Sequence, residues 1–166
     1  MRKLIIIALI GFTIIAAKAQ TTNNAITEHD AAVKAKDADI KTNIIDPAVA
    51  SANGQAPDWE NLKQAITQKY DATTADRTIT KGKIYFYYYK DWPVFCENIV
   101  HYTDAYELAN DFPLLNKNAK MILKNSTDQA QLKEAQKWAK LASDSDANNA
   151  DYKATFQALT DKLAGK

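Results

Sequence analysis

The chain has 166 residues, and its 21 basic and 20 acidic residues nearly cancel. This length suits one ordinary domain with a substantial core. The balanced charge, with no basic run, argues against nucleic acid or an anionic membrane as the partner.

Residues 1–19 have the pattern of a secretory leader. Two basic residues precede an apolar run over 4–15, and Ala17 and Ala19 supply the small side chains that signal peptidase reads. The apolar run is shorter than the roughly 20 residues needed to cross a bilayer. We therefore expect a bacterial periplasmic or secreted protein, without a membrane anchor after cleavage, that keeps 18 basic against 20 acidic residues.

Residues 20–56 are expected to form an alanine-rich helix and a linker. The helix, over 21–43, has a thin apolar stripe (Ile26, Val33 and Ile40), which is typical of a partly exposed or loosely docked helix. The Asp46–Pro47 pair should interrupt it, and 51–57 is a turn-rich connection.

Residues 57–166 have helical spacing throughout. We expect helices to begin at Asp58, at 73–76, at Asp91, at Asp111, at 126–128 and near Asn149, with the last ending near Gly165. In each segment, residues at helical spacing should share one face of the helix. In chain order these residues are Trp59, Leu62, Ile66 and Tyr70; Ile79, Gly82, Phe86 and Tyr89; Phe95, Ile99, Tyr102 and Tyr106; Leu114, Leu115, Asn118 and Ile122; Leu132, Ala135, Ala139 and Ala142; Tyr152, Phe156, Leu159 and Leu163.

Seven aromatic side chains fall within residues 85–95. Their strand propensity is strong, but no second segment of comparable β character exists to pair with them, so we predict a helix over 75–90. On that helix Phe86 and Tyr89 should face the interior, Tyr85 and Tyr88 should pack against a second neighbour, and Tyr87 should be the most exposed.

Cys96 is the only cysteine, so an internal disulfide framework, a CxxC redox pair and a thiolate zinc site are all excluded. Its apolar neighbours Val94 and Phe95 favour a buried, inert thiol. An intermolecular disulfide is the alternative.

No catalytic set is visible. His29 should be solvated and His101 should be a satisfied polar neighbour of the core, and neither has an obvious nucleophile partner. Residues 144–149 resemble the start of a calcium loop, but Asn149 and Thr155 replace its glycine and glutamate, so a turn that caps the last helix is favoured. We expect no enzyme activity, cofactor or metal.

The chain from 127 onward resembles a tetratricopeptide-type repeat. When Ala135 is placed at the small-residue position of the repeat's second helix, Ala139, Ala142 and Ala147 lie 4, 7 and 12 residues later, as expected for the family. The family usually has proline where this chain has Ala147. A wider stretch, from about Trp59 to Leu163, resembles the helical region behind thioredoxin-like domains in exported bacterial proteins. The residues that carry this second resemblance are Asp58-Trp59-Glu60, Ala75-Asp76-Arg77-Thr78, Lys83-Ile84-Tyr85, Lys90-Asp91-Trp92-Pro93, Asn125-Ser126-Thr127-Asp128 and Lys137-Trp138-Ala139-Lys140.

No segment of thioredoxin type precedes this region, so the resemblance implies helices and no thiol chemistry. It implies an all-α stack of antiparallel, tetratricopeptide-like helices over 57–166, which in such proteins serves as a docking surface for proteins or peptides.

We therefore expect a non-enzymatic module that binds a protein or peptide, with a homodimer as a further option. The alternatives are a carbohydrate- or small-ligand-binding protein that uses exposed aromatic rings, and an accessory of a thiol-redox system that acts through Cys96. The candidate interaction surface is Tyr87, Tyr88, Trp92, Tyr152 and Phe156. An exposed apolar end on the last helix would be the natural seam for a dimer or partner.

Overall fold

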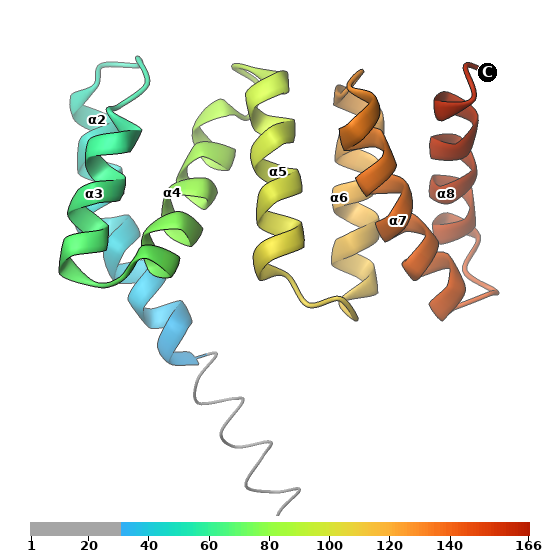
Figure 1. Ribbon diagram of the computed structural model, residues 1–166, viewed down its shortest axis with the longest axis horizontal. Coiled ribbons are helices and arrows are strands. Elements are labelled where there is room, and N and C mark those ends of the chain that lie inside the picture. The colour runs from blue at the N-terminus through green and yellow to red at the C-terminus, as the bar shows by residue number, and fades with distance from the viewer. Residues whose placement is uncertain (1–30) are drawn as a thin grey trace, which may run out of the picture. The chain divides into compact units, whose positions relative to one another are not determined.

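The computed structural model describes residues 31–166, and every regular element in this range is a helix (Figure 1). This confirms the all-α prediction, including the helix that we expected in the aromatic stretch. The expected leader, His29 and the first part of the N-terminal helix lie outside the described residues.

The chain divides into two units, residues 1–46 and 47–166. In the described part of the first unit, residues 31–40 are α-helical and Lys41–Ile45 form a π-helical turn, η1. In that turn the backbone N–H of Asp46 donates to the carbonyl of Lys41, five residues earlier.

The expected interruption at Asp46–Pro47 was wrong, because the helix α2 covers Asp46–Ser51. Pro47 is the second residue of α2, which follows η1 without a break, so the helix continues past Pro47 although proline has no backbone N–H to donate. The chain turns after α2 instead, at Asn53 and Gly54, which both have positive φ.

Six longer helices make up the rest of the second unit. They are α3 (Trp59–Lys69), α4 (Ala72–Tyr87), α5 (Trp92–Tyr106), α6 (Phe112–Asn125), α7 (Gln129–Ser145) and α8 (Ala150–Leu163). Each packs against the next one along the chain, and two further contacts join α5 to α7 and α6 to α8. Within this unit the six helices follow one another side by side and run in alternate directions (Figure 1).

Each of these six helices begins with an Asp or Asn side chain that accepts hydrogen bonds from backbone N–H groups of the first turn. Such a cap is worth about 1 kcal/mol. The expected helix starts are confirmed at Asp58, at Asp91, at Asp111, at 126–128 and near Asn149, and the caps there are Asp58, Asp91, Asp111, Asp128 and Asn149.

The exception is α4, both ends of which lie three residues earlier than we expected. Its cap is Asp71, which accepts from the backbone N–H of Thr74 at 2.6 Å and from the Thr74 hydroxyl at 2.7 Å. Because Asp71 caps the helix, α4 begins at Ala72, and residues 73–76, where we expected it to start, already belong to its first turns.

The main core lies among α5 to α8 and includes the expected alanine stripe of α7. Ala135, Ala139 and Ala142 are all completely buried, and α7 packs against both α6 and α8. Small side chains at these positions let the helix backbones approach closely, while larger residues such as Leu132 and Leu159 fill the space between them.

Hydrogen bonds from side chains to distant parts of the chain hold these helices in register. The Nζ of Lys162 donates to the carbonyls of Leu123 (2.6 Å) and Ser126 (2.9 Å), so α8 caps the end of α6. The indole Nε1 of Trp138 on α7 donates to Asp104 on α5 at 2.9 Å. α8 is therefore joined to α6, and α7 to α5, by hydrogen bonds as well as by apolar packing.

Candidate functional site

Four aromatic residues gather where α4 ends and α5 begins, and we call them the aromatic corner: Tyr85, Tyr88, Tyr89 and Trp92. The corner is unusual because large rings are displayed rather than buried. Tyr85 is 64% exposed, Tyr88 39% and Tyr89 74%, and Trp92 is half-buried.

Three of these rings, those of Tyr88, Tyr89 and Trp92, are held in place by contacts with one another. Tyr88 and Tyr89 lie 4.0 Å apart between ring centroids, and their hydroxyls are hydrogen-bonded at 3.0 Å. Trp92 contacts both rings edge-on, at 5.7 Å and 5.4 Å. Tyr88 and Trp92 also contact Phe95, which is buried in the main core, so the corner is anchored on the core.

The sequence-based orientations in this stretch were partly wrong. Tyr89 is strongly exposed and not interior, Tyr85 is strongly exposed as well, and Tyr87 is half-buried against the main core and is not the most exposed ring. The error at Tyr89 arises because α4 ends at Tyr87, so the helical period that we extended to residue 90 does not apply to Tyr88 and Tyr89.

The two C-terminal candidates, Tyr152 and Phe156 on α8, are half-buried, and Phe156 packs against the main core. The side chains that α8 exposes are small or polar, such as Lys153, Ala154 and Gln157. The expected exposed apolar end of this helix is therefore absent from the described residues, because its large hydrophobic side chains face α6 and α7.

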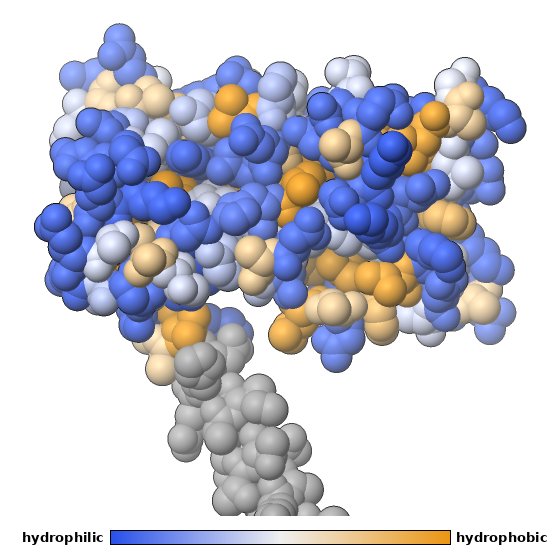
Figure 2. All heavy atoms as spheres, viewed as in Figure 1, coloured by the Kyte–Doolittle hydropathy of each residue, from blue (hydrophilic) through white to orange (hydrophobic). Residues whose placement is uncertain are grey.

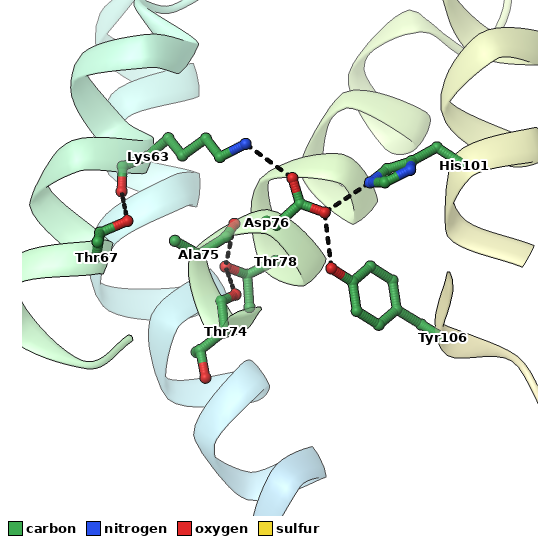
Figure 3. A network of polar contacts seen from close by, with 8 residues as sticks. All are labelled: Lys63, Thr67, Thr74, Ala75, Asp76, Thr78, His101 and Tyr106. Carbon is green, nitrogen blue, oxygen red and sulfur yellow. Dashed lines mark hydrogen bonds and ion pairs between the residues drawn. The ribbon is translucent and has the colours of Figure 1, made fainter. Parts of the chain in front are cut away.

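A second cluster, which the sequence did not reveal, surrounds Asp76 on α4 (Figure 3). Its Oδ1 accepts from the Nζ of Lys63 on α3 at 2.8 Å. Its Oδ2 is 2.6 Å from the Nε2 of His101 and accepts from the hydroxyl of Tyr106 at 2.7 Å, both on α5. One carboxylate therefore joins three successive helices.

The electrostatics of this cluster favour the ionised carboxylate. Burial of Asp76 opposes its ionisation, but the hydrogen bonds from Lys63, Tyr106 and His101 outweigh that effect and hold its pKa well below the usual range. Burial and the bond to Asp76 together raise the pKa of Tyr106, so its hydroxyl stays protonated and donates. Both carboxylate oxygens are thus occupied within the protein, and this arrangement serves to tie helices together.

His101 was expected beside the core, but half of its side chain is exposed and it bonds to Asp76. The expected polar partner is confirmed, but the expected location next to the core is wrong. Its neighbours Val100 and Tyr102 are apolar in the sequence, yet helical spacing turns His101 away from the buried Ile99 and Thr103 and toward α4.

We expect Asp76→Asn to lower the free energy of unfolding by about 1 kcal/mol at neutral pH, because the amide keeps the shape but loses the charge that Lys63 pairs with. Because the folded pKa of Asp76 is depressed, its contribution is complete above about pH 4, the unfolded value, and is lost as pH falls further.

Urea denaturation of the wild-type protein and of Asp76→Asn at several pH values measures the difference in their free energies of unfolding. The difference between them should shrink as pH falls below about pH 4, where the carboxyl group of Asp76 becomes protonated in the unfolded chain. A difference that stays unchanged between about pH 5 and pH 2 would contradict the assignment. Asp144→Asn, which removes one partner of an exposed helical ion pair, is the control and should have little effect.

Cys96 is completely buried on α5, as expected for an inert thiol. Burial raises its pKa to about 11, although the charge of Lys162 acts in the opposite direction. We expect the native protein to be unreactive with an aromatic disulfide reagent at neutral pH and to react fully once urea unfolds it. Fast reaction of the native protein would contradict the burial of this thiol.

A turn over 146–149 connects α7 and α8, as we predicted. Asp146 accepts from the backbone N–H of Asn148 at 3.0 Å, and Asn149 caps α8 through the N–H groups of Asp151 and Tyr152. Within residues 31–166, no group of three His, Cys, Asp or Glu side chains is placed to hold a metal ion. In the same range, no helix is both long enough and apolar enough to cross a membrane.

The comparisons with known proteins give no match, whether with family models, with curated proteins or with solved structures. The function therefore has to be inferred from the residues and contacts described above.

Proposed function

We propose that this protein is an exported, non-enzymatic, tetratricopeptide-like helical-repeat protein that binds a protein or peptide through its aromatic corner. The observation that carries the proposal is the exposure of Tyr85, Tyr88 and Tyr89 beside Trp92. Tyrosine and tryptophan supply large, rigid contact areas and are enriched among the residues that dominate binding energy at protein interfaces.

The repeat-like part of the proposal is supported by how α7 packs. Ala135, Ala139 and Ala142, placed at the family's small-residue steps, are completely buried, and α7 contacts the helices before and after it. The additional α5–α7 and α6–α8 contacts also support it, because in a stack of helix pairs a helix touches both its neighbour and the next helix but one, as α5 and α6 do here.

Export is supported by the leader pattern of residues 1–19. Cell fractionation of a bacterium that expresses the full coding sequence tests it. We expect a shortened chain beginning at Gln20 outside the cytoplasm, and an uncut chain in the cytoplasm would refute export.

The ring geometry favours a peptide over a sugar. Sugars stack on flat aromatic faces, but the rings of the corner meet at steep angles: 54° for Tyr88 and Tyr89, 85° for Tyr88 and Trp92, and 77° for Tyr89 and Trp92. Rings arranged in this way leave edges and hydroxyls on display, which suit the side chains and backbone of a peptide. Carbohydrate binding remains the second candidate because three exposed tyrosines could still contact a glycan.

A thiol-redox role receives little support, since Cys96 is buried and its pKa is raised to about 11.

Selection from a phage-displayed peptide library tests the proposed function. We expect the protein to enrich a common peptide motif, and the variant Tyr85→Ser/Tyr88→Ser/Tyr89→Gly to enrich none. Failure of the wild-type protein to enrich any motif above an uncoated surface would overturn the proposal. A fluorescence response to neutral glycans that the same variant lacks would favour the second candidate.

A further inference from the structure

The backbone at Tyr89 is the first sign of what the corner does. Tyr89 follows the end of α4 with φ +64°, in the left-handed region that favours glycine. The other described residues with positive φ are Asn53, Gly54 and Gly165, which are residue types that tolerate this conformation. Tyrosine at this position disfavours the folded state relative to glycine.

The ring of Tyr89 gives little stability in return, because it is the most exposed of the large hydrophobic side chains of residues 31–166. Its contacts are with Tyr88 and Trp92, which are themselves partly exposed. A strained backbone that displays a bulky ring to solvent is typical of binding sites, where the strain is retained for function.

The charge around the corner is the second sign. Residues 77–90 contain one arginine and three lysines and no acidic residue, although the whole chain is almost neutral. Asp91, the next carboxylate, accepts from the backbone N–H of Val94 as the cap of α5.

Two of these lysines flank the exposed tyrosines. Lys81 lies one helical turn before Tyr85, and Lys90 directly follows Tyr89; both are exposed. Neither forms an ion pair with another residue of the described range. Lys90 lies over the ring of Phe86, and Lys81 lies near the ring of Tyr102 and acts electrostatically on Glu107. The corner therefore has an exposed lysine on either side of its exposed tyrosines in the sequence.

We propose that the aromatic corner binds an acidic peptide segment, whose apolar or aromatic side chain packs on Tyr85, Tyr88 and Tyr89 while its carboxylates meet Lys90 and Lys81. This rests on the proposed function and names the class of peptide that the corner takes. Rings supply most of the contact area, and the lysines select the sign of the partner's charge.

Fluorescence anisotropy with two labelled peptides tests the proposal. The first carries aspartates around a single tryptophan, and the second has the same sequence with lysine in place of each aspartate. We expect the full protein to bind the acidic peptide at least about tenfold more tightly than the basic one, and this preference to weaken as NaCl rises from about 0.05 M to about 0.5 M. Equal affinity for the two peptides would overturn the proposal.

Two variants locate the site. Tyr89→Gly should weaken binding about tenfold while its melting temperature stays equal to or above that of the wild type, since glycine suits the backbone. Lys90→Gln should weaken binding and reduce its dependence on salt. The matched controls Leu108→Ala, which removes an exposed hydrophobic side chain elsewhere, and Lys133→Gln on α7 should bind as the wild type does.

Unchanged affinity of both Tyr89→Gly and Lys90→Gln would place the site elsewhere and refute the proposal. Displacement of the acidic peptide by an acidic polysaccharide at lower concentration than by unlabelled peptide would also refute it, in favour of a glycan. The experiments distinguish failure of this inference from failure of the proposed function. Enrichment of non-acidic peptides by the phage selection leaves the docking function standing and rejects this inference, whereas enrichment of no peptide rejects both.

Discussion

Trp138→Ala should lower the free energy of unfolding by about 3–5 kcal/mol, the range found when large aromatic side chains are removed from well-packed cores. Trp138 is 5% exposed and belongs to the main core among α5 to α8. Alanine would leave a cavity and would also leave Asp104 without the indole donor. For a domain of this size the melting temperature should fall by about 10 °C or more.

Urea denaturation followed by far-UV circular dichroism measures this loss. Trp138→Phe is the matched control, because it keeps an aromatic ring and removes the hydrogen bond to Asp104, and it should cost only about 1–2 kcal/mol. A loss below about 1 kcal/mol for Trp138→Ala would show that this ring does not join α7 to α5 as described.

Ala139→Leu should also destabilise the protein, by about 1–3 kcal/mol, although it adds hydrophobic surface. Ala139 is completely buried on α7, which packs against both α6 and α8, so the added carbons have no room without moving a helix. The effect distinguishes a close approach of helices from a core that merely requires apolar side chains.

Ala130→Leu, near the start of the same helix, is the control because residue 130 is exposed. Its effect should lie within about 0.5 kcal/mol of zero. Equal stability of Ala139→Leu and the wild type would contradict the close packing of α7 and would weaken the repeat-like reading of the chain.

The local features of the fold could be predicted from the sequence because their causes are local. An aspartate or asparagine followed by apolar residues at helical spacing identified five of the six helix starts in the second unit, for instance at Asp58 and Asn149. The same spacing identified buried positions such as Ile66 and Ala142. At Asp71 this signal was also present, but the threonines that follow it obscured the start of α4.

The features that depend on tertiary structure could not be predicted. Asp76 meets its partners across 13, 25 and 30 residues of sequence, and nothing in the spacing of Lys63, His101 and Tyr106 relates them to one another. The end of α4 was missed because Tyr87, Tyr88 and Tyr89 are alike in propensity, and neither glycine nor proline marks the point where the helix stops.

The hydropathy of the surface does not single out the corner either. Figure 2 shows hydrophobic residues gathered in places on the viewed face of the second unit, but tyrosine has a mildly polar index and does not stand out by this measure. Exposed leucines such as Leu108 and Leu141 are more hydrophobic, yet their backbone does not have the positive φ of Tyr89. What distinguishes the corner is the combination of displayed rings, the left-handed backbone of Tyr89 and the two flanking lysines.

NMR spectra of the protein with ring-labelled tyrosine, recorded during titration with the acidic peptide, test most directly whether the aromatic corner is the binding surface. We predict that the ring signals of Tyr85, Tyr88 and Tyr89 shift together and saturate, while those of Tyr70 and Tyr152 stay in place. Shifts at Tyr152 with none at Tyr85, Tyr88 and Tyr89, or no shift at any tyrosine, would contradict this account.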